Sequence, residues 1–294
     1  MNILGVKIDN FSKDEIVRKA NDFLNEDKFH QIATVNPEFI LEARGNEEFR
    51  NILNQCDLNV ADGVGIWFAF LRFGKYLKAR MAGADLMEEI LKIASINNYK
   101  IFLAASDRGL SSYEDTREAI LKKYPNLTIS GANIDCHSER SASWRRVEES
   151  NKKELDPSAS LRSAQDDIEK ISACDIIFCN FGAPYQEKFI YSLKNGENGS
   201  PHHLYPKSNN NVLHNNSLND SSFSLQNQRC RGKIRLAMGV GGSFDYLTGK
   251  LTRAPLILRQ IGLEWLWRLI QQPKRIKRIW NAVIIFPIKI IFSK

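Results

Sequence analysis

The chain has 294 residues, of which 43% are hydrophobic, and it carries a net charge of +7 at neutral pH. This length and composition indicate a globular protein, built as one large or two small domains, with room for an enzyme site. The five cysteines form no CxxC pair and have no companion histidine spacing, which argues against a zinc site and against a disulfide framework.

The beginning of the chain has neither the basic region nor the long apolar run of a signal peptide, and no stretch reaches the ~18 apolar residues of a membrane span. We therefore expect a cytoplasmic protein. The charge is unevenly placed, since the segment 253–294 carries +8 and the remaining residues sum to −1. The basic character belongs to the C-terminal segment alone.

Residues 1–30 predict a strand or hairpin followed by a helix, with Ser12 as N-cap and Glu15 three residues later in a capping-box pattern. Residues 32–35 form a short β-branched run that ends at an Asn-Pro pair, which is typical of a buried strand followed by a sharp turn. The apolar spacing over 38–55 then predicts a helix. Residues 57–61 predict a second strand.

The ends of these two strands carry the candidate chemistry. Two parallel strands that are one crossover helix apart lie side by side, so Thr34, Asn36 and Asp62 are expected around one crevice. A carboxylate beside a hydroxyl and an amide is a plausible general base with two positioning groups. The alternative is that Asn36 and Asp62 merely close turns, and these residues alone do not decide between the two.

Further along, residues 65–73 predict a buried helix and 85–97 another. Arg80 precedes the start of the second helix, where a cation and free amides could meet an anion, although a surface arginine is the simpler interpretation. Strands at 100–106 and 127–131 alternate with a helix at 111–123. This rhythm predicts an α/β fold with a largely parallel, Rossmann-like sheet flanked by helices.

Two stretches interrupt the rhythm. Residues 137–167 and 195–231 are so poor in apolar side chains that they predict mobile insertions. Four of the five histidines lie in them, so histidine is an unlikely base or metal ligand here. The sheet resumes with a strand at 175–181 and a helix to about 193, and 236–242 predict a last strand with a Gly-rich turn. The expected organisation is a core of residues 1–252 and an appendage of residues 253–294.

The appendage predicts a helix over 255–272 and a second helix from Pro273, with basic residues crowded near its start and Ile279 and Trp280 among its apolar residues. This pattern is typical of an interfacial helix on anionic lipid, and its apolar end is too short to span a bilayer. Nucleic-acid binding is the competing interpretation, but no stacking platform or motif accompanies the basic helix. An exposed apolar tail also favours self-association away from the membrane.

Seven blocks in order resemble one family, the bacterial WecG/TagA/CpsF glycosyltransferases, which include the N-acetylmannosaminyl transferases of wall teichoic acid synthesis. The blocks are Thr34-Val35-Asn36-Pro37-Glu38, Ala61-Asp62-Gly63-Val64-Gly65, Arg80 with Gly83-Ala84-Asp85-Leu86, Gly182-Ala183-Pro184-Tyr185-Gln186-Glu187, Gly239-Val240-Gly241-Gly242-Ser243-Phe244-Asp245, Arg253-Ala254-Pro255 and Gly262-Leu263-Glu264-Trp265. The ordered set covers nearly the whole chain outside the two interruptions.

The resemblance implies inverting transfer of a sugar, N-acetylmannosamine or a related one, from a UDP-sugar to a polyprenyl-diphosphate-linked sugar at the cytoplasmic face of the membrane. It implies that Asp62 is the general base and that the residues matching Thr34, Asn36 and Gln186 line the same pocket. It also implies that Arg268, Arg275 and Arg278 of the appendage complete the site on the membrane, which agrees with the lipid-facing interpretation drawn from charge.

No two aspartates have the Asp-x-Asp spacing through which many nucleotide-sugar transferases recruit a metal. We therefore expect a metal-independent reaction without a cofactor. Arginines and backbone amides are then expected to stabilise the charge of the departing UDP. The candidates are Arg80, Arg268, Arg275, Arg278 and the turn with Gly239, Gly241 and Gly242. Two alternatives remain: a nucleotide-cofactor-dependent oxidoreductase, although GxGxxG is absent, and a non-catalytic peripheral membrane adaptor.

Overall fold

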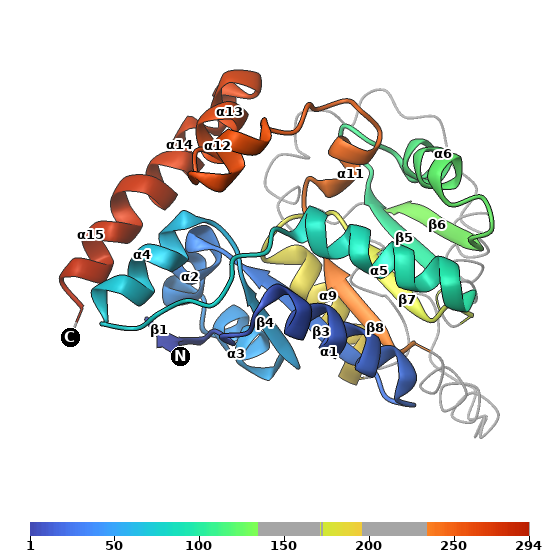
Figure 1. The fold of residues 1–294 in the computed structure, drawn as a ribbon, viewed down its shortest axis with the longest axis horizontal. Coiled ribbons are helices and arrows are strands. Elements are labelled where there is room, and N and C mark those ends of the chain that lie inside the picture. The colour runs from blue at the N-terminus through green and yellow to red at the C-terminus, as the bar shows by residue number, and fades with distance from the viewer. Residues whose placement is uncertain (135–170, 172, 196–233, 294) are drawn as a thin grey trace, which may run out of the picture.

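A computed structural model describes residues 1–134, 171, 173–195 and 234–293 (Figure 1). The predicted insertion 137–167 lies wholly outside the described residues, and the predicted insertion 195–231 does so except for Asn195. Their predicted mobility therefore stays a prediction.

A six-stranded sheet forms the centre of the described molecule, and all of its strands are parallel. Its spatial order is β4-β3-β8-β7-β5-β6. The strands are β3 (His30–Val35), β4 (Leu58–Ala61), β5 (Ile101–Ser106), β6 (Ile129–Ile134), β7 (Ile176–Cys179) and β8 (Leu236–Gly239). The short strands β1 (Asn2–Ile3) and β2 (Val6–Lys7) pair separately as a hairpin. The predicted α/β fold with a parallel sheet is confirmed.

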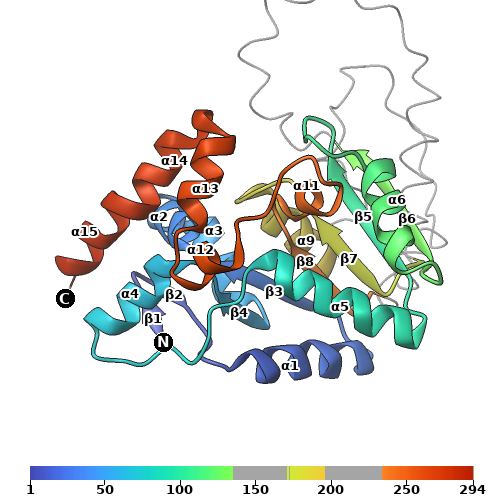
Figure 2. The same ribbon diagram turned by 45° about the horizontal axis from the view of Figure 1, so that its top comes forward.

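Helices cover both faces of this sheet (Figures 1 and 2). Among the described residues up to Asn195, the helices are α1 (Lys13–Asn25), α2 (Pro37–Gly45), α3 (Glu47–Gln55), α4 (Val64–Arg72), α5 (Gly83–Asn97), α6 (Tyr113–Lys123) and α9 (Tyr185–Asn195). Along β3, Ile32 packs in the cluster with α1 and α5, whereas Ala33 and Val35 pack in the cluster with α2, α3 and α4. Both faces of a central strand are therefore apolar, as a covered parallel sheet requires.

Two predicted helices are each broken in the structure. The helix predicted over 38–55 is interrupted at Asn46, whose side-chain oxygen accepts a hydrogen bond from Phe49 N at 3.0 Å and so begins α3 as a new helix. The helix predicted over 255–272 is divided by Gly262, whose φ of +81° a right-handed helix does not allow. In both places a local backbone feature overrides the apolar periodicity.

Residue 243 begins a chain of short helices that continues through the C-terminal segment. They are α11 (Ser243–Leu247), α12 (Leu256–Gln260), α13 (Glu264–Gln271), η1 (Pro273–Arg275), α14 (Ile276–Trp280), the π-helical stretch η2 (Asn281–Ile285) and α15 (Phe286–Ile291). In both ribbon views α15 lies alongside α4 (Figures 1 and 2). Within the described parts of the chain, no helix combines the length and the apolar character needed to cross a bilayer.

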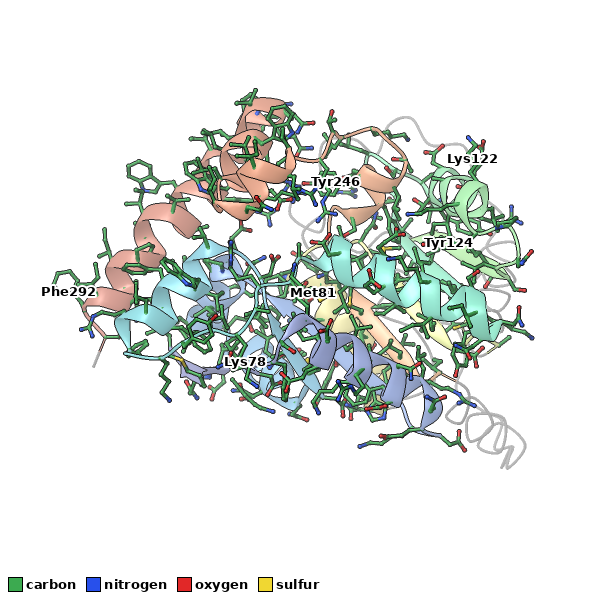
Figure 3. All side chains as sticks on the ribbon, viewed as in Figure 1. Lys78, Met81, Lys122, Tyr124, Tyr246 and Phe292 are labelled. Atoms are coloured by element: carbon green, nitrogen blue, oxygen red, sulfur yellow. The ribbon has the colours of Figure 1, made fainter. Side chains whose placement is uncertain are left out.

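One face of this segment packs on the core, and the other is open. Phe286 and Ile290 are fully buried in the cluster that contains Ile66 and Phe70 of α4. By contrast, Trp280 is 55% exposed and Phe292 is 82% exposed at the far end of the segment (Figure 3). The segment is thus amphipathic, with an apolar surface left uncovered.

Replacing Phe286 with alanine is expected to lower the free energy of unfolding by about 3–5 kcal/mol, because a fully buried aromatic ring is removed and a cavity remains. The exposed Phe292 provides a matched control, and Phe292→Ala is expected to change stability by less than about 0.5 kcal/mol. Urea unfolding of the two variants measures the difference. Equal effects would contradict the packing of α15 on the core.

Candidate active site

The ends of β3 and β4, which lead to Asn36 and Asp62, lie side by side. The register pairs Val35 with Ala61, and Asp62 N donates a hydrogen bond to Val35 O at 2.9 Å. Thr34 is buried beneath the first turn of α5, where a Cβ added to Gly83 would lie 3.2 Å from its hydroxyl oxygen. The prediction that these strand ends are neighbours is confirmed.

Asn36 has a structural role at the same edge of the sheet. Its side-chain oxygen accepts a hydrogen bond from Phe39 N at 3.1 Å and caps α2, and Pro37 occupies the first helical position. This is the turn-closing contact that the sequence left open as the simpler interpretation. It uses one acceptor of the Asn36 side chain and fixes the exit from β3.

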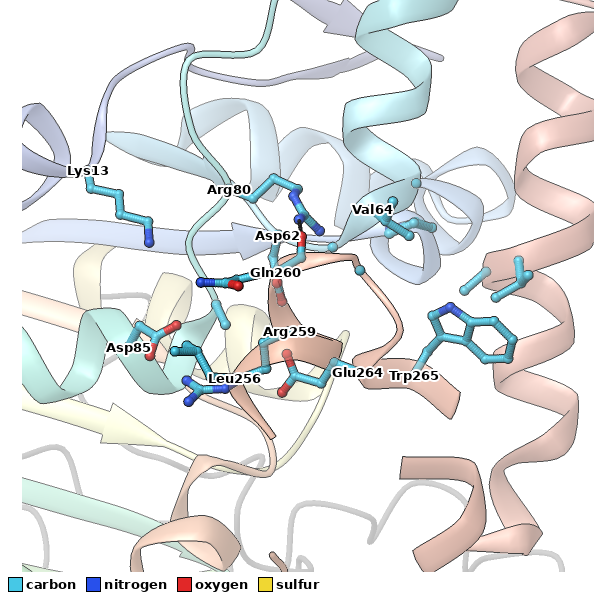
Figure 4. A pocket seen from close by; sticks show the side chains of 17 residues that line it. Lys13, Asp62, Val64, Arg80, Asp85, Leu256, Arg259, Gln260, Glu264 and Trp265 are labelled. Atoms are coloured by element: carbon cyan, nitrogen blue, oxygen red, sulfur yellow. Dashed lines mark hydrogen bonds between the residues drawn. The ribbon is translucent and has the colours of Figure 1, made fainter. Parts of the chain in front are cut away.

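A cavity of about 450 Å³ opens beside Asp62 (Figure 4). Core residues line one side of it, and residues of α12 and α13 with the loop between them line another. Arg80 crosses between the two sides, since its Nη2 donates a hydrogen bond to Gln260 O at 3.2 Å. The charged lining residues are Lys13, Asp62, Arg80, Asp85, Arg259 and Glu264.

Gly262 allows this contact between the C-terminal segment and the core. A Cβ at Gly262 would lie 2.9 Å from Val64 Cβ and 3.4 Å from Arg80 Nη1, so a side chain there would meet α4. The positive φ of Gly262 independently disfavours any other residue. The close approach of the C-terminal segment to α4 therefore depends on Gly262.

The surroundings of Asp62 raise the pKa of its carboxyl group. Burial raises the pKa of Asp62 from its ordinary value of 3.8 to about 7, and the nearby carboxylate of Glu264 adds to the shift. Arg268 lowers the pKa, Asp85 raises it, and a hydrogen bond from Gly63 N–H lowers it. A carboxyl group with a pKa near neutrality can accept a proton at physiological pH.

Three arginines of the C-terminal segment lie near one another, and one of them, Arg268, also interacts electrostatically with Asp62. Arg268 lies against the Gly-rich turn, because a Cβ on Gly242 would overlap its Nη2, and its guanidinium carbon is 5.4 Å from the centre of the Tyr246 ring. Burial and the neighbouring positive charges of Arg268 and Arg278 together lower the pKa of Arg275 to about 10. Arg278 is balanced by Glu38, whose oxygen accepts a hydrogen bond from Arg278 Nε at 2.8 Å. The cluster has an excess of positive charge that suits an anion.

Gln186 lies inside the structure beneath the glycine turn. Its Oε1 accepts hydrogen bonds from Gly182 N at 3.1 Å and from Gly241 N at 3.2 Å, and its Nε2 donates to Glu187 Oε1 at 2.7 Å. A Cβ on Gly239 would overlap both of these side chains, which explains the glycine. Burial raises the pKa of Glu187 to about 7. Gln186 thus joins the turn after β7 to the turn after β8.

The predicted site residues are distributed among several places. Asp62 and Arg80 line the cavity, whereas the other nine do not. Of those nine, Arg268, Arg275 and Arg278 form the arginine cluster, Gly242 lies against it, and Gly239 and Gly241 contact Gln186. Thr34 and Asn36 lie at the end of β3.

The sequence analysis assigned no role to Arg259, Glu264, Trp265 or Glu187. A signal for Glu264 was present, since it is the single acidic residue of a segment that carries +8. Trp265 belongs to the same block as Glu264. In the described residues, His, Cys, Asp and Glu side chains form no group of three or more that is arranged to hold a metal ion.

Comparison with known proteins identifies the family of the chain. The model of the glycosyl transferase WecG/TagA/CpsF family matches residues 1–200 and 223–294. Proteins from two strains of Staphylococcus aureus are 27% identical over 296 residues, which is 100% of this chain and 93% of each relative. Both relatives are named N-acetylglucosaminyldiphosphoundecaprenol N-acetyl-beta-D-mannosaminyltransferase. The chain belongs to the WecG/TagA/CpsF family of glycosyl transferases.

Proposed function

We propose that this glycosyltransferase moves N-acetylmannosamine or a related sugar from a UDP-sugar to a polyprenyl-diphosphate-linked N-acetylglucosamine, with inversion at the anomeric carbon. The names of the relatives support the acceptor and the β linkage of the product. Membership in a family of enzymes favours this proposal over the oxidoreductase and over the non-catalytic membrane adaptor.

The observation that carries the proposal is that Asp62 borders a cavity and is also close to one member of the arginine cluster. The carboxyl lines the cavity and also interacts electrostatically with Arg268, which lies on the glycine turn. An inverting transferase needs a base beside the acceptor hydroxyl and positive charge beside the departing diphosphate. The cavity beside Asp62 can hold the acceptor, and the arginine cluster can hold the departing diphosphate.

In the proposed step, Asp62 accepts the proton of the acceptor hydroxyl while that oxygen attacks the anomeric carbon. The bond between the anomeric carbon and the UDP oxygen breaks, and UDP leaves with the bonding electron pair. The positive charge of Arg268 and Arg275 stabilises the additional charge on the departing diphosphate. A single displacement of this kind inverts the anomeric configuration.

The proposal places the enzyme on the inner face of the cell membrane as a peripheral protein, with residues 253–294 as an appendage on anionic lipid. The uncovered apolar side chains of α14 and α15 and the +8 charge of this segment support the placement. We also propose that neither a metal ion nor a cofactor takes part, which EDTA treatment tests. Nucleic acid is not an expected partner, and self-association away from the membrane is tested by light scattering.

Acceptor-dependent release of UDP tests the function. The full chain is mixed with UDP-N-acetylmannosamine and with bilayer discs that contain a lipid-diphosphate-N-acetylglucosamine. We expect UDP release only when both substrates are present, and a panel of other UDP-sugars identifies the preferred donor. Absence of release with every donor on the panel would contradict the proposed function.

The pH dependence of kcat/KM follows from the pKa of Asp62. Since the carboxylate must be ionised to accept a proton, kcat/KM is expected to rise with pH, with a midpoint near 7, and to level off above it. Glu264→Gln removes a negative neighbour that raises this pKa, so the midpoint is expected to move to lower pH. Asp27→Asn, in the exposed loop between α1 and β3, should leave the midpoint unchanged. An unchanged or higher midpoint in Glu264→Gln would contradict the assignment of Asp62 as base.

A further inference from the structure

The cavity beside Asp62 is lined by a cationic group, Arg259, to which the proposed reaction step assigns no role. Arg259 lines it from α12, and the Nε of this side chain is buried with no hydrogen-bond partner among the described residues. A buried guanidinium N–H without a partner is costly, because the desolvation of the charged group is not compensated. Arg80 adds a second guanidinium to the same cavity, so two guanidinium groups and the ammonium group of Lys13 line a space of about 450 Å³.

The remaining lining is suited to a sugar. Glu264 and Asp62 present carboxylate oxygens that can accept hydrogen bonds from hydroxyl groups, and Trp265 brings an aromatic ring to the cavity (Figure 4). The charges of the six ionisable lining residues cancel when all are ionised. The cavity lining therefore has no net positive charge that would favour a purely anionic ligand. A ligand with a neutral polar part and a localised anionic part fits this distribution.

The position of the cavity indicates a lipid-linked ligand. Ala282 and Val283 of η2 line it, and the flanking Trp280 and Ile284 are 55% and 37% exposed. The cavity therefore borders the uncovered apolar surface of the C-terminal helices. A water-soluble nucleotide sugar gains nothing from this border, whereas a ligand anchored in a bilayer can reach the cavity from it.

We propose that this cavity binds the terminal sugar and the adjoining diphosphate of the lipid-linked acceptor, with Arg80 and Arg259 on the diphosphate and Glu264 and Trp265 on the sugar. The inference rests on the proposed function and assigns the acceptor to the cavity, which leaves the arginine cluster and the glycine turn to the donor. Arg259, Glu264 and Trp265 then determine acceptor specificity. All three come from the C-terminal segment, so the acceptor site is incomplete without it.

Michaelis constants for the two substrates test this assignment. For Arg259→Gln in bilayer discs, the acceptor KM is expected to rise about tenfold or more, as the loss of a charge-assisted contact implies, while the donor KM stays within about twofold. Arg18→Gln removes the same charge from an exposed site on α1 and should change neither constant. A higher donor KM with an unchanged acceptor KM, or no change in either constant, would overturn the assignment.

Binding without turnover separates this inference from the proposed function. Wild-type protein and Arg259→Gln are applied to discs with the lipid-diphosphate sugar, to discs with anionic phospholipid alone, and to inorganic pyrophosphate in solution. We expect Arg259→Gln to lose about tenfold in affinity for the acceptor discs only. Equal affinity of the two proteins for the acceptor discs refutes the cavity as acceptor site, even if wild type transfers no sugar. If the binding difference is observed but wild type transfers no sugar, the proposed donor or reaction is wrong, and the acceptor site is not.

Discussion

Asp62→Asn is expected to lower kcat by about 10²- to 10⁴-fold, the range that a positioned general base contributes. Asparagine has nearly the same shape as aspartate, so the hydrogen bond from Asp62 N to Val35 O and the packing of the strand ends should be retained. What is lost is the ability to accept the proton of the acceptor hydroxyl. Steady-state kinetics in bilayer discs at pH 8, above the pKa of about 7, measure the change with the wild-type carboxylate ionised.

The control for this variant is Asp27→Asn, which neutralises an exposed aspartate outside the cavity. It should leave kcat within about twofold of wild type, and both variants should melt at nearly the same temperature. If Asp62→Asn keeps more than about a tenth of the wild-type kcat, another group accepts the proton and the mechanism is wrong.

Arg268→Gln is the second change with a large expected effect. Arg268 lies against Gly242 and Tyr246, and it is also one of the positive neighbours of Asp62. Its loss removes stabilisation of the departing diphosphate, so we expect kcat/KM for the donor to fall by about 10²- to 10³-fold. The same variant should move the midpoint of the pH profile upward, because the arginine lowers the pKa of Asp62. Donor kinetics at several pH values measure both effects.

Lys122→Gln serves as the control, since this exposed lysine on α6 (Figure 3) forms a salt bridge with Glu118 of the same helix and does not line the cavity. It should leave donor kinetics and the pH midpoint unchanged. A decrease confined to acceptor kinetics in Arg268→Gln would reverse the division of the two substrates between the cavity and the arginine cluster.

The fold was largely predictable because its signals are local. The β-branched run at 32–35, the Asn-Pro pair and the Ser12 capping box each specify their own element, and all three are present in the structure. The sheet followed from the alternation of such elements. The breaks at Asn46 and Gly262 were missed, because apolar periodicity continues across a helix interruption that only capping and φ reveal.

The site was harder to predict because long-range packing assembles it. Asp62 and Arg80 stand next to turn signals in the sequence, but Arg259 and Glu264 reach the same cavity only because Gly262 lets the C-terminal segment approach α4. Gln186 lies buried beneath the glycine turn, a position that no sequence spacing indicates. Contacts between residues so far apart along the chain leave no periodic trace in the sequence.

The most direct test of the central claim is the product itself. Full-length protein, UDP-N-acetylmannosamine and acceptor discs are incubated together, and the extracted lipid is analysed by mass spectrometry and by NMR of the new anomeric proton. The mechanism predicts an acceptor that is heavier by one N-acetylhexosamine with a β linkage, formed by wild type and absent with Asp62→Asn. An α linkage, or a product that Asp62→Asn forms at the wild-type rate, would contradict a single displacement with Asp62 as base.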